Sequence, residues 1–326
     1  MSEGKKHRLV TRSDFDGLVC AVLLKEIDQI DEILFVHPKE MMDGNVEITS
    51  RDISTNLPYV HDCYLAFDHH ASEAIRRGDQ NRDNHILDPT ADSAARVVYD
   101  YYGGKERFPR VPDALMEAVD KADSARFEMQ ETLAPTGWAL LNFIMDPRTG
   151  LGRFRNFRIS NYQLMMHLID YCRRHTVEEI LELPDVKERV ELYHAHSQQA
   201  REQIQRCSTI HGNLVVLDLR DEETIHPTNR FMVYALHPAC NISIHVLWGK
   251  ERQNTVFAIG NSIFNRTSAT NIGELCMQYG GGGHNNAGIA MVENDQADEE
   301  LRALIERINS DDDSPILEIC AVCDEA

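Results

Sequence analysis

The chain has 326 residues, which is long enough for two domains with separate cores. It contains no run of about 18 apolar residues, and its first residues hold no apolar signal-peptide core, so we expect neither a membrane-spanning helix nor a membrane partner. The formal net charge of −20 argues against a long groove for duplex nucleic acid, where basic residues supply most of the affinity. The eight cysteines are scattered rather than arranged in a small secreted framework, which predicts a cytoplasmic location.

The first half of the chain alternates between strand-like and helix-like segments. Strands are predicted at residues 7–12 (HRLVTR), 32–37 (EILFVH), 46–50 (VEITS) and 63–67 (CYLAF). Helices are predicted at residues 18–30, 91–104 and 111–124, the last with a proline in its first turn. Alternation at this spacing is typical of an α/β fold with a parallel sheet.

The middle of the chain, residues 176–207, is charged and helical, and Thr176 and Glu179 are spaced as a capping box. A long helix here would connect two domains. Beyond it, strands at 212–220, 241–249 and 255–262 are interleaved with helices at 229–237 and 271–280, which predicts a second, smaller α/β unit. We therefore predict a first domain at 1–180, a helical connector at 181–210, a second domain at 211–310 and an acidic tail at 311–326.

Two carboxylates occur in the segment DFDG, Asp14 to Gly17, between a predicted strand and a predicted helix. Asp14 and Asp16 can point into one cleft there, and hard divalent cations prefer such oxygen ligands. An Asx turn with a helix N-cap explains the same pattern and is favoured for this motif alone. Asp52 follows the predicted strand at 46–50, and by itself it is an ordinary loop aspartate.

The segment Asp68-His69-His70 ends the predicted strand at 63–67. The exit of a buried strand into a cleft is a common place for metal ligands. Adjacent histidines point in different directions, so one can be an inner ligand while the other contacts substrate or supports the ligands. A surface histidine pair is the alternative. Asp123, with Asp120 as its rival, ends the predicted helix at 111–124 and adds a further candidate carboxylate.

Four consecutive glycines, residues 280–283, precede His284. Such a run costs conformational entropy on folding, so it suggests a place where backbone N–H groups closely approach a ligand such as an anion. A flexible linker is the alternative, but the run contains no serine and lies between a predicted helix and the strand-like AGIAMV. We favour the functional interpretation.

Taken in order, these motifs resemble those of the DHH phosphoesterase superfamily, and the resemblance covers most of the chain. The DFDG segment, a lone aspartate, Asp-His-His and a further aspartate resemble the catalytic DHH domain. GGGGHNNAG resembles the signature of the DHH-associated C-terminal domain. The resemblance implies an α/β fold, with a parallel-sheet catalytic domain joined by a helical connector to a smaller α/β domain.

The resemblance also implies a pair of divalent ions, Mn²⁺ in the first instance, with Mg²⁺ or Co²⁺ as alternatives. Asp14 would bind one ion and Asp16 the other, and Asp52 would bridge them. His69 and Asp123 would complete the ligand shell of the second ion. Two such ions clamp the attacking and leaving oxygens and lower the pKa of a bridging water.

The implied catalytic residues are Asp68 and His70, with His70 facing the scissile phosphate or its leaving group. Many members carry a histidine just ahead of the DxD motif, where this chain has Val10 and Arg12. Arg12 could contact a phosphate, and a structural role is equally supported. In the second domain, the implied substrate-binding residues are Arg266, Gly281, Gly282, Gly283 and His284.

The resemblance implies a metal-dependent phosphodiesterase that hydrolyses very short 5′-phosphorylated oligonucleotides, foremost dinucleotides such as pGpG, to mononucleotides. This is the nanoRNase or linear-dinucleotide branch of the superfamily. The alternatives are a pAp phosphatase or exopolyphosphatase, and a catalytically weak nucleotide sensor that the missing histidine would explain. The acidic composition favours a short nucleotide as the partner, and a homodimer is left open.

Residues 148–162 combine arginines with aromatic side chains, a pattern that can hold a base and a phosphate of a short single strand. An ordinary connecting loop is equally compatible with this composition. In the tail, Cys320 and Cys323 form a single CxxC, which favours two free thiols over a zinc site.

Overall fold

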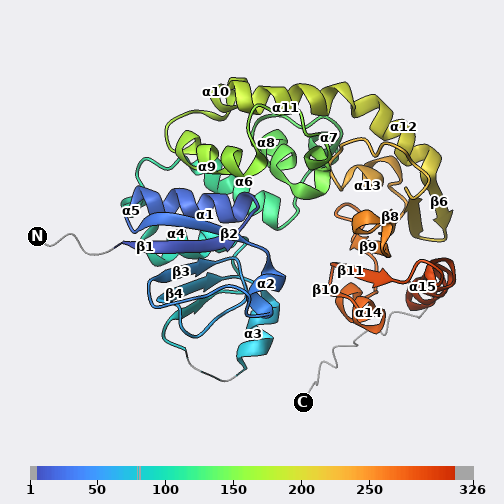
Figure 1. Cartoon of the computed structure of the whole chain (residues 1–326), viewed down its shortest axis with the longest axis horizontal. Coiled ribbons are helices and arrows are strands. Elements are labelled where there is room, and N and C mark those ends of the chain that lie inside the picture. The colour runs from blue at the N-terminus through green and yellow to red at the C-terminus, as the bar shows by residue number, and fades with distance from the viewer. Residues whose placement is uncertain (1–5, 79, 81, 313–326) are drawn as a thin grey trace, which may run out of the picture. The chain divides into compact units, whose positions relative to one another are not determined.

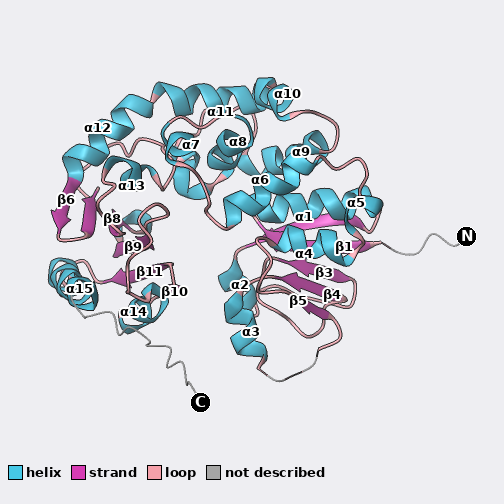
Figure 2. Cartoon of the chain, turned by 180° about the vertical axis from the view of Figure 1, so that it is seen from behind, coloured by secondary structure: helices cyan, strands magenta, loops and turns pink. Residues whose placement is uncertain are grey.

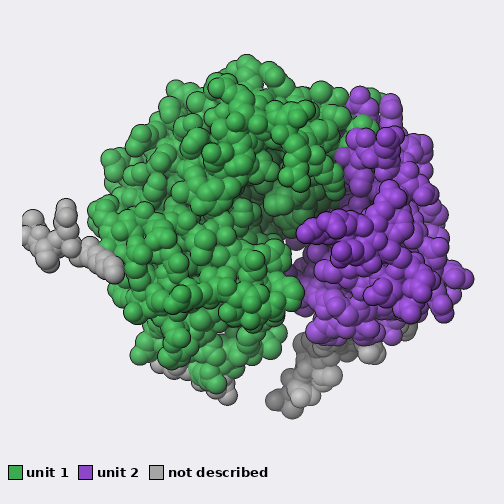
Figure 3. All heavy atoms as spheres, in the orientation of Figure 1, with its two compact units in different colours: residues 1–198, 226–230 green, residues 199–225, 231–326 purple. Residues whose placement is uncertain are grey.

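The computed structural model describes residues 6–78, 80 and 82–312 (Figure 1). The chain divides into two compact units, residues 1–198 with 226–230 and residues 199–225 with 231–326 (Figure 3). The domain boundaries at 180 and 210 stay predictions. The predicted acidic tail lies outside the described residues except for 311 and 312, and so does its CxxC segment.

The first unit is built around a five-stranded sheet with the order β2-β1-β3-β4-β5. Every neighbouring pair of strands in it is parallel. The carboxyl ends of the strands therefore meet at one edge, where ligand sites form in sheets of this kind. The strands are β1 (His7–Arg12), β2 (Ile30–Val36), β3 (Asp52–Thr55), β4 (Leu65–Asp68) and β5 (His85–Leu87).

Helices accompany this sheet, and Figure 2 shows them in a separate colour. They are α1 (Phe15–Glu26), α2 (Pro38–Met42), α3 (Ala71–Arg77), α4 (Ala94–Tyr101), α5 (Gly104–Arg107), α6 (Asp113–Asp123), α7 (Met129–Leu133), α8 (Gly137–Met145), α9 (Asn161–Cys172), α10 (Val177–Glu182) and α11 (Pro184–Ala195). Every side chain of α1 from Leu18 to Leu24 is fully buried. This fits its position, because α1 packs against β1, α4, α6 and α9.

The third strand does not lie where the sequence suggested. Residues 46–50 form a loop, and β3 begins at Asp52. Asp52 is therefore the first residue of its strand, in register with Arg8 near the start of β1. Its carboxylate is 1% exposed and accepts hydrogen bonds from Arg8 Nε at 2.7 Å and from the Thr49 backbone N–H at 2.7 Å.

Asp52 thus lies at the amino edge of the sheet, opposite the edge that β1 and β4 reach at their carboxyl ends. This position and the pairing with Arg8 do not support the prediction that Asp52 bridges two metal ions. The apolar alternation of VEITS predicts a strand there, whereas the strand in the structure, DIST, is short and carries polar side chains. Two of these, Ser54 and Thr55, are buried within the sheet, and Thr55 donates a hydrogen bond to Thr11 at 2.7 Å.

The helical stretch at 176–207 is also not one helix. It contains α10, α11 and α12 (Ser197–Cys207). The first break falls at Leu183, whose extended backbone is the conformation favoured before a proline, here Pro184. The predicted capping box of Thr176 and Glu179 is confirmed, with both reciprocal hydrogen bonds present.

The second unit contains a six-stranded mixed sheet with the order β10-β11-β9-β8-β7-β6. Its strands are β6 (Ser208–His211), β7 (Leu214–Asp218), β8 (Ile242–Trp248), β9 (Thr255–Asn261), β10 (Gly282–His284) and β11 (Ala287–Val292). Its helices are α13 (Met232–Leu236), α14 (Ile272–Gln278) and α15 (Ala297–Asp312). Buried side chains of α14 and α15 form a core with β7, β8, β9 and β11.

Among the described residues, no helix is long and apolar enough to cross a membrane.

Replacing Asp52 by alanine tests its structural role. We expect Asp52→Ala to lower the free energy of unfolding by about 3 kcal/mol, because it leaves Arg8 without its buried partner. Metal binding should stay unchanged. The measurements are urea denaturation and Mn²⁺ binding by equilibrium dialysis. The matched control is Asp31→Ala, which removes an exposed ion pair with Arg51 and should cost less than about 1 kcal/mol. Loss of metal from folded Asp52→Ala protein would restore Asp52 as a ligand.

Candidate metal centre

The two carboxylates of DFDG are fixed where β1 ends and α1 begins. Asp14 caps α1 by accepting the Gly17 backbone N–H at 2.9 Å. Asp16, in the first turn, is 2% exposed and accepts the backbone N–H groups of Ala94 and Ala95 at 3.0 and 2.7 Å. A Cβ atom at Gly17 would lie 2.0 Å from the Arg12 carbonyl oxygen, so glycine is required for α1 to start this close to β1.

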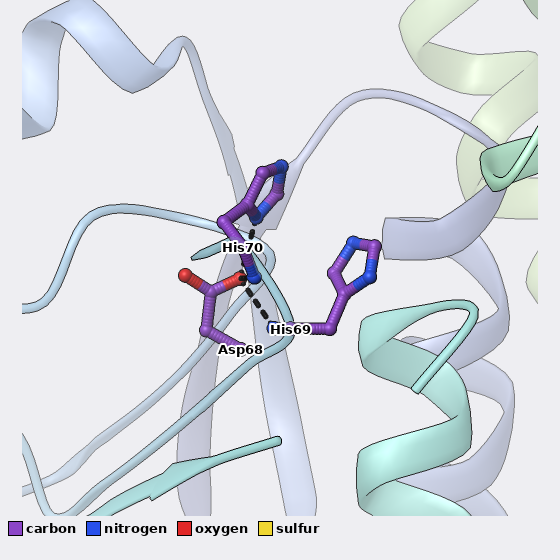
Figure 4. A group of neighbouring side chains, drawn as sticks. All are labelled: Asp68, His69 and His70. Atoms are coloured by element: carbon purple, nitrogen blue, oxygen red, sulfur yellow. Dashed lines mark hydrogen bonds and ion pairs between the residues drawn. The ribbon is translucent and has the colours of Figure 1, made fainter. Parts of the chain in front are cut away.

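Asp68, His69 and His70 leave the carboxyl end of β4 (Figure 4). Asp68 Oδ1 accepts the His69 backbone N–H at 2.8 Å and lies 2.6 Å from His70 Nδ1. Asp68 Oδ2 is buried and accepts no hydrogen bond from any described residue. The two imidazole rings point in different directions, as expected for adjacent residues.

The His69 ring lies beside the carboxylates of Asp16 and Asp123. Its Nδ1 lies 3.2 Å from the Ala91 carbonyl oxygen, so Nδ1–H donates there, and its Nε2 lies 2.9 Å from Asp123 Oδ2. Metal-binding histidines are oriented in this way, with one ring nitrogen tied to a carbonyl and the other directed at the ion. One ligand atom each from Asp16, His69 and Asp123 lies within 4.8 Å of the others.

The rival of Asp123 is committed elsewhere. Asp120 accepts hydrogen bonds from Ser93 Oγ at 2.7 Å and from Arg96 Nε at 3.0 Å, an arrangement that ties α6 to the start of α4. Of the two aspartates near the end of α6, Asp123 is therefore the one in the cluster with His69.

The pKa values in this cluster show that its acids are crowded. Burial and the neighbouring Asp123 raise the pKa of Asp16 to about 8. Burial alone would lower the pKa of His69, but its ion pair with Asp123 outweighs burial and raises this pKa to about 9. Burial also raises the pKa of Asp14, although Arg12 opposes the shift. Without metal, the negative charge of these carboxylates is thus partly neutralised by protons on Asp16 and His69 and by the Arg12 guanidinium. A divalent cation could neutralise it instead.

Asn56, the residue directly after β3, is a member of this cluster that no sequence motif indicates. It is 2% exposed, and its Nδ2 donates to Asp14 Oδ1 at 3.1 Å. Its Oδ1 is buried and accepts no hydrogen bond from the described part of the chain. Asn56 has a φ of 55°, a conformation that asparagine tolerates better than most residues. It occupies the strand end that sequence analysis had assigned to Asp52, and correct placement of β3 would have revealed it.

Two arginines approach the cluster. Arg12 Nε lies 3.0 Å from Asp14 Oδ2. Arg148 is held by Asp146, with its Nε and Nη2 at 2.7 and 2.8 Å from the two carboxylate oxygens, and it lies close enough to Asp14 to act on the pKa of that carboxyl.

Two other residues of the arginine- and aromatic-rich stretch, Phe157 and Arg158, contact residues outside the carboxylate cluster. The Arg158 backbone N–H donates to Glu188 at 3.1 Å, and the Arg189 guanidinium lies 4.1 Å from the centre of the Phe157 ring. Arg148 is an arginine of this stretch that acts on the carboxylate cluster, through Asp14.

The glycine run has a packing role in the second unit. A Cβ atom at Gly281 would lie 1.9 Å from the Ile289 carbonyl oxygen, and one at Gly283 would lie 2.3 Å from that of Ala287. These two glycines let β10 and β11 lie close together. A Cβ atom at Gly282 would meet no described atom within 4 Å, so its backbone has an open side. Arg266, whose Nε donates to the Ile263 carbonyl at 3.1 Å, and His284, the last residue of β10, belong to this unit too.

The residues of the first unit fit a divalent cation. They offer several carboxylates, an amide oxygen and one oriented imidazole nitrogen, the ligand types that hard and borderline divalent ions accept. Asn56 Oδ1 and Asp68 Oδ2 are buried acceptors without a hydrogen-bond donor among the described residues, and a cation would satisfy them.

No protein-family model and no curated protein matches the chain. Among solved structures, the pGpG-specific phosphodiesterase PggH from Vibrio cholerae is 60% identical to it, with a TM-score of 0.81. That match covers 94% of this chain and 100% of the other. The chain belongs to the DHH phosphoesterase superfamily, in the branch of this enzyme. The resemblance and the two-domain α/β fold class predicted from the sequence are confirmed.

More distant solved structures share the fold. An exopolyphosphatase-related protein from Bacteroides fragilis is 12% identical, with a TM-score of 0.53 and coverage of 94% of this chain and 93% of that one. CDC45 from Entamoeba histolytica is 9% identical, with a TM-score of 0.52 and coverage of 93% and 95%. At such identities the likeness concerns the fold alone.

A DHH phosphoesterase with this site should release protons when it binds metal. In metal-free protein the pKa of His69 is about 9 and that of Asp16 about 8, so both groups hold protons at neutral pH. Because a cation binds the deprotonated forms, Mn²⁺ binding should release protons, and its apparent affinity should rise between pH 6 and about 9. Titration calorimetry in two buffers of different ionisation enthalpy measures this. Asp123→Asn, which removes the partner of His69, should reduce the proton release. Equal heats in both buffers at pH 7 would contradict the expectation.

Proposed function

We propose that this protein is a divalent-metal-dependent phosphodiesterase that hydrolyses linear dinucleotides such as pGpG to mononucleotides. The observation that carries the proposal is the 60% identity to a pGpG-specific phosphodiesterase over that enzyme's whole length. The cluster of Asp16, His69 and Asp123 supports it, because it supplies the ligands that such a reaction needs.

The proposed metal ligands form two groups. Asp16, His69 and Asp123 would hold one ion, and Asp14, Asn56 and Asp68 the other. We propose Mn²⁺ as the metal, with Mg²⁺ and Co²⁺ as alternatives. When bound, such ions would polarise the scissile phosphate and lower the pKa of the attacking water.

His70 is the proposed general acid, with Asp68 as the residue that positions it. Burial alone would lower the pKa of His70, but its hydrogen bond to Asp68 outweighs burial and raises this pKa. The ring is therefore more often protonated near neutral pH than an ordinary histidine, which suits donation of a proton to the leaving oxygen. Arg12, already beside Asp14, remains a proposed phosphate contact.

The alternatives have less support. The exopolyphosphatase-related neighbour is only 12% identical, so it informs the fold and not the substrate. A sensor without activity would not need to keep so many buried carboxylates together with an oriented imidazole. A cytoplasmic location remains a prediction, which the unpaired thiols of the described cysteines support. A homodimer stays an open prediction.

The deciding experiment compares pGpG, a pentanucleotide, pAp and triphosphate as substrates in Mn²⁺, Mg²⁺ and Co²⁺, with products separated by chromatography. We expect rapid conversion of pGpG alone, to GMP. His70→Ala should lower kcat by roughly 100-fold or more, since a general acid contributes this much. His61→Ala, which changes a histidine with a 91% exposed side chain, is the matched control and should keep full activity.

Release of phosphate from pAp or triphosphate would instead indicate a phosphatase. Binding of pGpG without turnover in any of the three metals would indicate a sensor.

The second unit is proposed to contribute substrate contacts through Arg266, Gly281, Gly282, Gly283 and His284. We expect Gly282→Ala to fold normally, because its new methyl group meets open space, and to raise KM for pGpG. Gly283→Ala should lower the thermal stability instead, because its methyl group would lie 2.3 Å from the Ala287 carbonyl oxygen. Thermal denaturation and steady-state kinetics separate the two effects. An unchanged KM in Gly282→Ala would remove this backbone from the substrate site.

A further inference from the structure

The two halves of the metal centre differ in charge. In one half, Asp16 and Asp123 supply two formal negative charges beside the neutral ligand nitrogen of His69, and together they balance one divalent ion. In the other half, Asp14 and Asp68 also supply two negative charges. The third ligand-type group there is the amide of Asn56, which is neutral.

Arg12 makes the second half still less negative. Its guanidinium lies 3.0 Å from Asp14 Oδ2, so one of the two negative charges already has a fixed positive partner. Arg148 does not change this balance, because Asp146 pairs with it through two hydrogen bonds. At most one net negative charge is left in this half for an ion that carries two positive charges, and none is left when His70, 2.6 Å from Asp68, is protonated.

The acceptor oxygens of this half are nevertheless suited to bind a cation. Asn56 Oδ1 and Asp68 Oδ2 are both buried, and neither accepts a hydrogen bond from the residues that the structure describes. Asn56 follows β3 and Asp68 is the last residue of β4, and these two strands are paired. The Asn56 amide is oriented by donation of its Nδ2 to Asp14, which directs Oδ1 elsewhere. This half therefore offers oxygen acceptors for a cation, but its negative charge is smaller than the positive charge of a divalent ion.

We propose that this enzyme holds one divalent ion tightly at Asp16, His69 and Asp123, and takes up the second at Asp14, Asn56 and Asp68 only together with its substrate. The phosphodiester of a dinucleotide brings negative charge, which the second half lacks. This inference rests on the proposed function for the identity of the substrate. Substrate and second ion then raise each other's affinity by the same factor.

The test adds Mn²⁺ to metal-free protein and counts the ions bound per chain by equilibrium dialysis. Electron paramagnetic resonance then reports whether two bound ions form a spin-coupled pair. We expect one tight ion, with the second bound roughly 100-fold more weakly, near the upper end of measured couplings. An uncleavable pGpG analogue, with a methylene group in place of the bridging oxygen, keeps the phosphate charge and should bring in the second ion. A methylphosphonate-linked analogue, whose linkage is neutral, should not.

Two variants test the charge argument without substrate. Asn56→Asp adds the missing charge, and aspartate tolerates the positive φ of this position. Arg12→Gln removes the fixed positive charge. Each should bind two Mn²⁺ ions tightly in the absence of any nucleotide. Arg158→Gln, which changes an arginine paired with Asp185 outside the cluster, is the control and should keep the single tight ion. Thermal denaturation checks that each variant folds.

Two equally tight ions in the wild-type protein without nucleotide would overturn the inference, as would an unchanged count in both folded variants. Failure of the charged methylene analogue to bind at any Mn²⁺ concentration would refute the proposed substrate instead. In that case the variants alone decide the charge argument, since their readout needs no nucleotide.

Discussion

The parallel register of β1, β3 and β4 places the residues that follow three strands at one edge of the sheet. Asp14, Asn56 and Asp68 become neighbours for this reason alone. Because these polar groups are largely withdrawn from water, each must be satisfied by a donor, a proton or a cation. Most of what distinguishes this site follows from how those demands are met.

Helix ends meet part of the demand. Asp16 accepts two backbone N–H groups at the start of α4, which satisfies free donors of that helix and locks α1 to it. Asp120 serves the same junction through Ser93 and Arg96. The carboxylates at this end of the sheet therefore stabilise the fold as well as forming a site. The remaining charge stays crowded, and the raised pKa values of Asp16 and His69 are its signature.

Sequence patterns identified most of this arrangement, because DFDG and Asp-His-His carry their own local signals. Each lies where an apolar segment gives way to polar residues, and such a change marks a strand end. Asn56 carried no comparable signal. Its strand, DIST, has only one aliphatic side chain, and it is stabilised by pairing between β1 and β4 rather than by an apolar pattern of its own. The loop at 46–50 has a more strand-like pattern, so the sequence predicts the ligand at Asp52. In the structure Asp52 lies at the amino edge of the sheet.

The glycine run shows a second limit of sequence patterns, since one residue type can answer two needs. Gly281 and Gly283 are required by the close approach of β10 to β11, whereas Gly282 is not. Only the structure distinguishes the glycines that strand packing requires from the one that it does not.

In the metal centre, too, the residues that maintain the fold can be distinguished from those that determine the chemistry. Structures that are only 9–12% identical to this chain share its fold. Asn56 lies beyond the last residue of β3, so its charge can change while the register of the strands persists. Reaction and metal requirement can therefore diverge on this fold through single residues at the carboxyl ends of β1, β3 and β4.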